Sequence, residues 1–214
     1  MTGYQHEKHI AVIAVDIQGD FTRAENGSLA TLDSDQNYLT LVRHFCADVA
    51  RQGGLVIATQ DWHPGSHLSF ASNHQNTKPF DQITLPSGIN QTLWPDHCIQ
   101  GTPGARILLD KGSYHHVVQK GTKPGFDSYS GFFDDGNHPT GMISLLKKLS
   151  IRKVYVFGLA TDYCVKATAI DARKQGLEVV FIEDLSRPVS KESESESIEE
   201  MKSLGIRIEN LLKN

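Results

Sequence analysis

Short apolar runs alternate with amphipathic stretches along this chain of 214 residues. The first run, 9–15, is apolar at nearly every position, which is typical of a strand buried on both faces of a parallel sheet. Later runs of the same character predict further strands at 55–59, 117–119, 154–157 and 179–182.

Helical spacing fills the intervals between these runs. Apolar residues recur along one face over 39–50, and a Gly-Gly pair then stops the pattern. Similar patterns predict helices over 142–149 and 165–175, and the acidic run 191–197 predicts the solvated start of another helix. Strands that alternate with helices predict an α/β fold.

One long region, 61–115, interrupts this alternation. It is rich in Pro, Gly, Asn and His and has no convincing period. Ordered loops of this length usually carry function, so we expect part of a site here.

Composition bounds the class of protein. Hydrophobic residues make up 39% and charged residues 21% of the chain, which fits a single globular domain over 1–214. A net charge of -4 and a pI of about 6.2 argue against non-specific nucleic-acid binding, so small molecules are the expected partners. No segment reaches the roughly 18 apolar residues of a membrane span, and the N-terminus resembles neither a signal peptide nor an anchor.

The three cysteines, Cys46, Cys98 and Cys164, are far apart and odd in number. A disulfide framework is therefore not expected. We expect a reducing compartment, the cytoplasm. Cys46 lies on the apolar face of the first predicted helix, where a structural role is expected.

Reactive side chains follow four of the predicted strands. Asp16 follows the first, Asp61 with His63 the second and Lys120 the third, while a turn after the fourth leads to Cys164. Ligands of open parallel sheets bind outside the carboxyl ends of the strands. We therefore expect these groups at one edge of the sheet.

Cys164 is the candidate nucleophile. The helix expected to begin near it would place the sulfur at a helix N-terminus, which lowers a thiol pKa and offers N-H groups to an oxyanion. A lone cysteine is more often a buried structural residue, Asp16 could be a turn residue, and Lys120 could be a solvated loop lysine. Convergence of the three would instead give an activated nucleophile with its base.

Histidines and a carboxylate suggest a metal site. Asp61 and His63 form an Asp-x-His pair that directs two ligands to one side, and a distant histidine such as His97 can complete the set. His67 is a fourth candidate. Ten histidines would also produce some clustering by chance, so spacing alone leaves this site open.

Five segments together resemble the nicotinamidase (pyrazinamidase) family of the isochorismatase-like cysteine hydrolases. They are Asp16-Ile17-Gln18-Gly19-Asp20-Phe21, Thr59-Gln60-Asp61-Trp62-His63-Pro64, the stretch 93–102 around Trp94-Pro95-Asp96-His97-Cys98, Gln119-Lys120-Gly121, and Gly158-Leu159-Ala160-Thr161-Asp162-Tyr163-Cys164-Val165. The resemblance implies a three-layer sandwich with a mainly parallel six-stranded sheet and helices on both faces.

The resemblance also implies residue roles. Asp16, Lys120 and Cys164 would form a catalytic triad, and the N-H groups of Ala160 and Cys164 an oxyanion hole beside a cis peptide between Leu159 and Ala160. The implied metal ligands are Asp61, His63 and His97, with zinc the first expectation and iron or manganese the alternatives. Phe21, Trp94 and Tyr129 match positions that wall the substrate ring.

Gly19 departs from the family pattern, which usually has Asn there beside the metal waters and substrate. The implied activity is hydrolysis of nicotinamide to nicotinate and ammonia through a thioester on Cys164, in NAD salvage, with pyrazinamide as a further substrate. Oligomeric state stays open, a homo-oligomer included.

Three other interpretations remain. A related amidohydrolase could use the same triad on another amide, and a metal-dependent hydrolase could activate water while Cys164 is incidental. A binding module on this scaffold would leave the three strand-end residues without a purpose.

Overall fold

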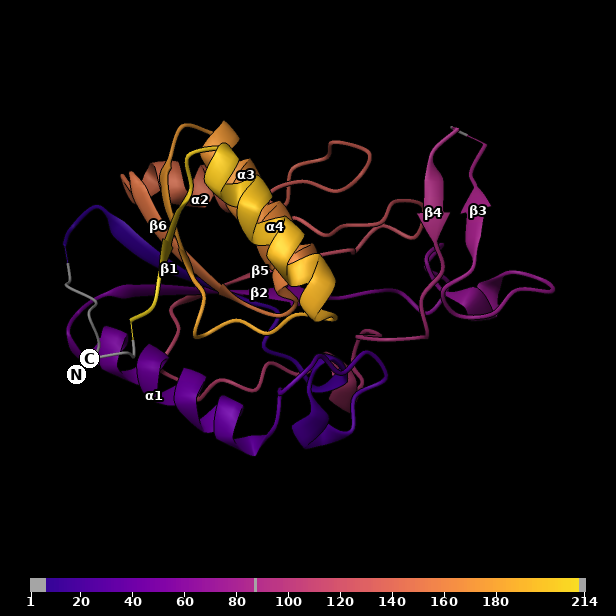
Figure 1. Cartoon of the computed structure of the whole chain (residues 1–214), viewed down its shortest axis with the longest axis horizontal. Helices are drawn as coiled ribbons and strands as arrows, with labels where there is room; N and C mark the ends of the chain where they lie inside the picture. Colours follow the sequence, from indigo (N-terminus) through magenta and orange to yellow (C-terminus); the bar gives the residue numbers. More distant parts are fainter. Residues whose placement is uncertain (1–6, 87, 212–214) are drawn as a thin grey trace.

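A parallel sheet of six strands organises the computed structural model, which describes residues 7–86 and 88–211 (Figure 1). Its strand order is β5-β2-β1-β6-β7-β8, and every pairing is parallel. The strands are β1 (Ile10–Val15), β2 (Leu55–Asp61), β5 (His116–Lys120), β6 (Lys153–Gly158), β7 (Glu178–Ile182) and β8 (Arg207–Glu209). The chain builds one half of the sheet outward from β1 and then returns to build the other half from β6.

All five predicted strands are present, with ends shifted by at most two residues. Two of these shifts matter, because Asp61 and Lys120 are the last residues of β2 and β5 instead of the first loop residues after them. The sixth strand, β8, was not located by the apolar pattern because an arginine and a glutamate flank a single isoleucine in it.

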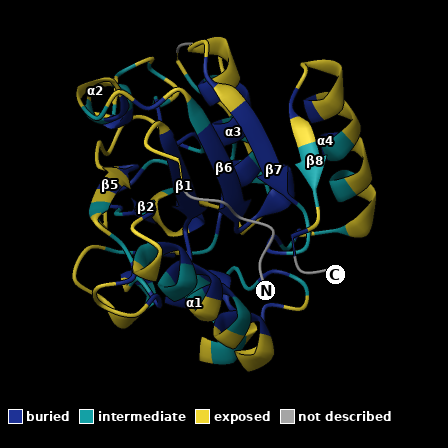
Figure 2. Cartoon of the chain, turned by 90° about the vertical axis from the view of Figure 1, so that its left-hand side faces the viewer, coloured by how far each residue is buried: buried dark blue, intermediate teal, exposed yellow. Residues whose placement is uncertain are grey.

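Helices cover both faces of the sheet, as the α/β prediction required. Helix α1 (Gln36–Arg51) packs with strand residues such as Val12 and Phe157 on one face. On the other face lie α2 (Met142–Lys148), α3 (Lys166–Lys174) and α4 (Lys191–Ser203). Figure 2 shows the central strands buried between these two layers.

Local signals set the helix ends. Asp35 accepts a hydrogen bond from the Tyr38 N-H and so caps α1, and Ser190 caps α4 by accepting from the Ser193 N-H. The acidic run is the exposed first half of α4, as predicted, where its carboxylates favour the positive helix end.

The irregular region 61–115 contains one regular feature, a small antiparallel hairpin of β3 (Gln82–Thr84) and β4 (Asn90–Thr92). It projects from the body of the molecule beyond the carboxyl ends of the central strands (Figure 1). Its three-residue strands are too short to give a visible apolar alternation, so the sequence predicted only a loop here. No helix among the described residues is long and apolar enough to cross a membrane.

Candidate active site

The strand-end side chains converge as the sequence predicted. Asp16 directly follows β1, and in the sheet Asp61 pairs with Lys120 at the ends of β2 and β5. The reactive atoms of Asp16, Asp61 and Cys164 all lie within 4.8 Å of one another. A backbone φ of 49° at Asp16 ends the strand in a tight turn, which holds its carboxylate inside the molecule.

Lys120 is the centre of the cluster and is 1% exposed. Its Nζ lies 2.5 Å from Asp61 Oδ1 and 3.0 Å from Asp16 Oδ2. The same atom donates to the Ser128 carbonyl at 2.9 Å and lies 3.4 Å from the Cys164 Sγ. Lys120 is therefore no solvated loop lysine, because every contact of its ammonium is to a buried group.

Burial and charge shift the ionisation of these groups in different directions. Burial opposes the charge of Lys120, but Asp16 and Asp61 outweigh it and raise the lysine pKa well above its usual range. Burial likewise opposes ionisation of Asp61, but Lys120 and His63 lower the pKa of Asp61 below its usual range. Burial raises the pKa of Asp16 despite Lys120, so this carboxylate is suited to accept a proton.

The Cys164 thiol departs from one expectation. The sequence predicted a lowered pKa from a helix N-terminus, but burial raises the thiol pKa well above its ordinary value, with Lys120 acting in the opposite direction. The resting sulfur is thus a thiol whose proton must pass to a neighbouring base during attack.

The nucleophile sits in an unusual helical turn. Thr161–Val165 form a single π-helical turn that runs directly into α3, so Cys164 lies inside the first turn of a continuous helix and not ahead of it. The peptide bond between Leu159 and Ala160 is cis, as the family resemblance implied. Within the described residues the Ala160 N-H donates to no protein group, which leaves it available to an oxyanion beside the sulfur.

Asp61, His63 and His97 form a buried group with metal-ligand spacing. Asp61 Oδ2 lies 3.4 Å from His63 Nε2 and 4.0 Å from His97 Nε2. The Nδ1 atoms of the two rings face the Gly121 and Pro95 carbonyls, at 2.9 and 2.8 Å. These contacts direct both Nε2 atoms toward Asp61.

His67 lies beside this group but is not oriented to join it. Its Nε2 lies 3.1 Å from the Phe126 carbonyl, which requires a proton on that nitrogen, and its Nδ1 lies 2.8 Å from the Ser69 hydroxyl. No ring nitrogen is then left with a free lone pair. His67 instead packs on His63, with ring centroids 4.2 Å apart.

Sequence reasoning gave no role to two residues that support the ligands. Gln18 donates to the Asp61 carbonyl and accepts from the Asp61 N-H, at 2.9 and 2.8 Å. Gly121 has a φ of 63°, and a Cβ on it would lie 2.2 Å from the His63 ring. The signals in the sequence that could have indicated them are a glutamine two residues after Asp16 and a glycine next to Lys120.

The remaining loop residues of the first motifs are packed tightly. A Cβ at Gly19 would lie 3.1 Å from backbone atoms of Pro103 and Gly104, so the family's usual asparagine would require these two loops to shift. The Cys98 sulfur lies 3.8 Å from the Gly104 carbonyl and is not part of the group formed by Asp61, His63 and His97. Cys46 is buried in the α1 core, as expected.

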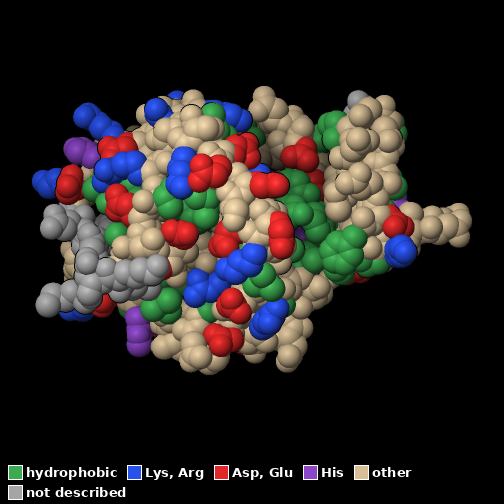
Figure 3. Space-filling model, viewed as in Figure 1, with side chains coloured by type: hydrophobic (Ala, Val, Ile, Leu, Met, Phe, Trp, Pro, Cys, Tyr) green, Lys and Arg blue, Asp and Glu red, His purple; other side chains and the backbone are tan. Residues whose placement is uncertain are grey.

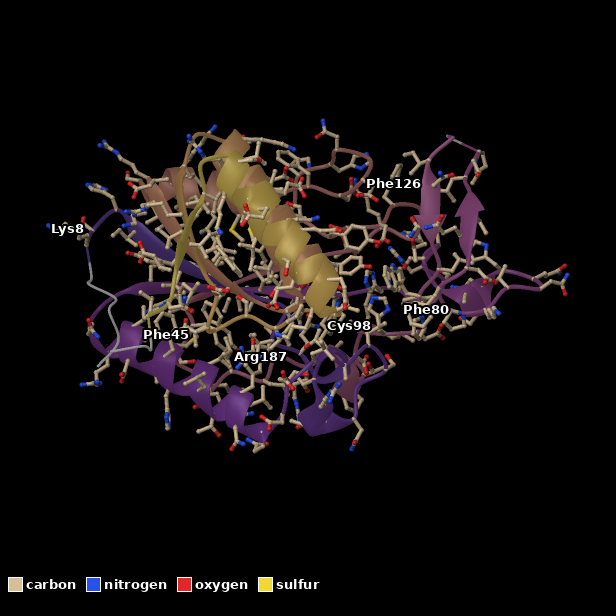
Figure 4. The ribbon with its side chains drawn as sticks, viewed as in Figure 1. Lys8, Phe45, Phe80, Cys98, Phe126 and Arg187 are labelled. Carbon is tan, nitrogen blue, oxygen red and sulfur yellow. The ribbon has the colours of Figure 1, made fainter. Side chains whose placement is uncertain are left out.

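A cavity of about 190 Å³ opens onto Cys164, Asp61 and His97. Phe21, Trp94 and Tyr129, the residues expected to wall a substrate ring, all line it. Sequence reasoning missed several further lining residues: Leu29, Phe80, Tyr163 and Val189. Figure 3 shows hydrophobic side chains gathered between the body of the molecule and the projecting hairpin, and Figure 4 places Phe80 near the base of that hairpin.

Comparison with known proteins agrees with this geometry. A family model described as the isochorismatase domain matches residues 10–210. The chain belongs to the isochorismatase family. It is 42% identical over 184 residues to a nicotinamidase of Acinetobacter baylyi, covering 84% of this chain and 81% of that protein.

Two solved structures resemble the whole fold. A nicotinamidase/pyrazinamidase of Acinetobacter baumanii superimposes with a TM-score of 0.86 at 36% identity, covering 96% of this chain and 98% of that one. A pyrazinamidase of Pyrococcus horikoshii in complex with zinc gives a TM-score of 0.78 at 34% identity, covering 95% and 99%. The α/β fold with six parallel strands and two helical layers is thereby confirmed as that of isochorismatase-like hydrolases.

Proposed function

We propose that the chain is a nicotinamidase that hydrolyses nicotinamide to nicotinate and ammonia through a thioester on Cys164. The observation that carries the proposal is the buried Lys120 ammonium, which touches Asp16, Asp61 and the Cys164 sulfur at the base of an apolar cavity. The relatives described as nicotinamidases, over more than four fifths of the chain, support the choice of amide.

In this mechanism Asp16 is the proton carrier. It takes the Cys164 proton as the sulfur attacks the carboxamide carbon, and it returns that proton to the departing amine, so ammonia leaves and a thioester remains. Water then attacks the thioester with one proton passing to Asp16, and the sulfur takes that proton as the C–S bond breaks. The nicotinic acid formed becomes nicotinate when its remaining proton passes to the released ammonia or to solvent. Lys120 holds Asp16 in place and stabilises the sulfur whenever it carries negative charge.

The oxyanion of each tetrahedral intermediate needs donors near Cys164. The Ala160 N-H, which is free among the described groups and lines the same cavity, is the proposed donor together with the Cys164 N-H.

The residues present fit a divalent cation held by Asp61, His63 and His97. The buried His63 Nε2 has no hydrogen-bond partner among the described residues, as expected of an atom that binds an ion. One carboxylate with two imidazoles suits zinc, with iron and manganese as alternatives, and the similar Pyrococcus structure is described as a complex with zinc. When bound, such an ion supplies a Lewis acid beside the substrate ring.

The cavity walls suit a flat aromatic amide. Trp94, Tyr129 and Tyr163 surround the space with mutually tilted or perpendicular rings. We propose Phe21, Trp94 and Tyr129 as contacts of the substrate ring, and pyrazinamide, which keeps the ring size and the carboxamide, as a second substrate. We propose the cytoplasm as the compartment, from the odd cysteine count and the three free thiols.

Ammonia release from nicotinamide by the purified, metal-loaded protein tests the proposal. Cys164→Ala is expected to lose activity by about 10³-fold or more. Cys46→Ala removes a thiol from the α1 core on the other face of the sheet, and it should retain activity. Equal rates in wild type and Cys164→Ala would refute the nucleophile, and full activity after complete alkylation of Cys164 would favour the metal-dependent hydrolase.

A further inference from the structure

Lys120 has one contact that the proposed mechanism leaves without a purpose. Besides its two carboxylates and the sulfur, its ammonium donates to the Ser128 carbonyl at 2.9 Å. Among the described groups this oxygen is the backbone acceptor of the ammonium, so its position helps to set the distance between Lys120 and Cys164. Ser128 belongs to an irregular segment, and its backbone needs support from elsewhere.

That support comes first from Asp127, which is 5% exposed. Its Oδ1 accepts from the Ser128 N-H at 2.9 Å, and its Oδ2 accepts from the side-chain amide of Gln91 at 2.8 Å. Gln91 is 4% exposed, and the same amide nitrogen also donates to the Thr92 carbonyl at 2.7 Å. Both oxygens of a buried carboxylate are therefore used to join two segments 36 residues apart.

A second contact holds the residue that follows Ser128. The Tyr129 hydroxyl accepts a hydrogen bond from the Trp94 indole N-H at 3.1 Å. Gln91 lies on β4 and Trp94 follows that strand, so both supports come from the projecting hairpin and its return (Figure 1). The hairpin and its return therefore contact the segment 127–129 on both sides of the Ser128 carbonyl.

We propose that Gln91 and Asp127 are positioning residues that hold the Lys120 ammonium against Cys164 through the Ser128 carbonyl. The inference rests on the proposed function, since it gives the hairpin a part in the same reaction. It predicts that the direction of the Gln91 to Asp127 hydrogen bond matters, and not merely the space that the two side chains fill.

Gln91→Glu is the sharpest perturbation, because it keeps the shape of the side chain but replaces the donor with an acceptor that faces Asp127. If Gln91 only fills space, Gln91→Glu should behave like wild type and Gln91→Ala should be worse. If Gln91 positions Asp127, Gln91→Glu should be more impaired than Gln91→Ala, because the new carboxylate repels Asp127. Adding Asp127→Asn to Gln91→Glu supplies a donor on residue 127 and keeps the acceptor for the Ser128 N-H, so the pair should regain function.

Two readouts follow these variants at pH 8. We expect Gln91→Glu to lower kcat for nicotinamide by about 10-fold or more and to change KM less, since misplacement near the lysine affects the attack more than ring binding, even though Asp127 and Ser128 also line the cavity. We also expect Gln91→Glu to slow the alkylation of Cys164 by iodoacetamide by about 10-fold. Mass spectrometry measures this rate, and Cys164→Ala serves as the blank. The Gln91→Glu/Asp127→Asn protein should recover to within about 3-fold of wild type.

Asn90→Ala is the matched control, because Asn90 is the neighbouring amide on β4 but its side chain, among the described residues, accepts one exposed hydrogen bond from the Thr84 hydroxyl. It should leave both rates unchanged. Alkylation needs no nicotinamide, so it still tests the positioning role if the protein proves to act on another amide. Wild-type rates in Gln91→Glu, or an equal loss in Asn90→Ala, would overturn the inference, and so would absence of recovery in the double variant.

Discussion

Replacing Lys120 with methionine tests how much the lysine charge stabilises the buried carboxylates of Asp16 and Asp61. The substitution keeps an unbranched side chain of similar length but leaves Asp16 and Asp61 without their shared cation. Oxygens of these two carboxylates lie within 4.8 Å of each other. With an effective dielectric of about 20, two full charges at that distance repel by about 3.5 kcal/mol. Removing one partner from a buried ion pair typically destabilises a protein by about 3–5 kcal/mol, so the two magnitudes agree.

The penalty should depend on pH. Without Lys120 the pKa of Asp16, which burial already raises, rises further. A carboxyl with a raised folded pKa binds its proton more tightly in the folded than in the unfolded chain, so its contribution to stability is present at low pH and lost as the pH rises through the folded pKa. Lys120→Met should therefore lose less stability at pH 5 than at pH 8.

Urea unfolding of the metal-free protein at these two pH values measures the effect, with chelator present so that no ion neutralises Asp61. Lys174→Met is the control, since Lys174 makes an exposed ion pair with Asp171 at 3.4 Å and should cost less than about 1 kcal/mol. A Lys120→Met penalty no larger than that of Lys174→Met would refute the electrostatic account, as would a greater penalty at pH 5.

The remaining predictions concern single groups of the site. Wild-type kcat/KM should fall as the pH drops through the pKa of Asp16, which lies above the ordinary 3.8, and Asp16→Asn should lose at least about 100-fold in kcat. His63→Ala should lose metal, as measured by elemental analysis, whereas His67→Ala should keep it, and the opposite result would return His67 to the ligand set. Trp94→Ala should raise KM for nicotinamide by roughly 10-fold with a smaller change in kcat, because Trp94 lines the cavity without touching the sulfur cluster.

The sheet was predictable because its central strands are buried on both faces. Apart from His9, the run 9–15 has no polar position, and the end of β1 follows from the first polar residue after it, Asp16. The ends of β2 and β5 do not follow in this way, because both strands continue through polar residues. The convergence of Asp16, Lys120 and Cys164 followed from the rule that parallel strands deliver their carboxyl ends to one edge. The edge strand β8 was not predicted because it has only three residues and a single apolar one.

The sequence could not predict features that depend on contacts between distant loops. The orientation of His67 is decided by the Phe126 carbonyl, 59 residues away, and no spacing rule reports such a contact. The raised thiol pKa of Cys164 depends on its burial among distant segments, which local position near a helix start does not reveal. Gln91 is likewise an ordinary polar residue in sequence and becomes informative only when its amide is seen on Asp127.

Asp61 joins the catalytic and metal-type groups through its two oxygens. Oδ1 lies 2.5 Å from Lys120 Nζ, while Oδ2 faces His63 and His97. Asp61→Asn therefore changes both groups at once: it weakens the metal site and removes half of the negative charge that holds the lysine. His97→Ala removes a proposed ligand that does not touch Lys120, so excess metal should restore part of its activity. The same metal should not restore Asp61→Asn, and equal recovery of the two variants in a zinc titration would show that Asp61 serves the metal alone.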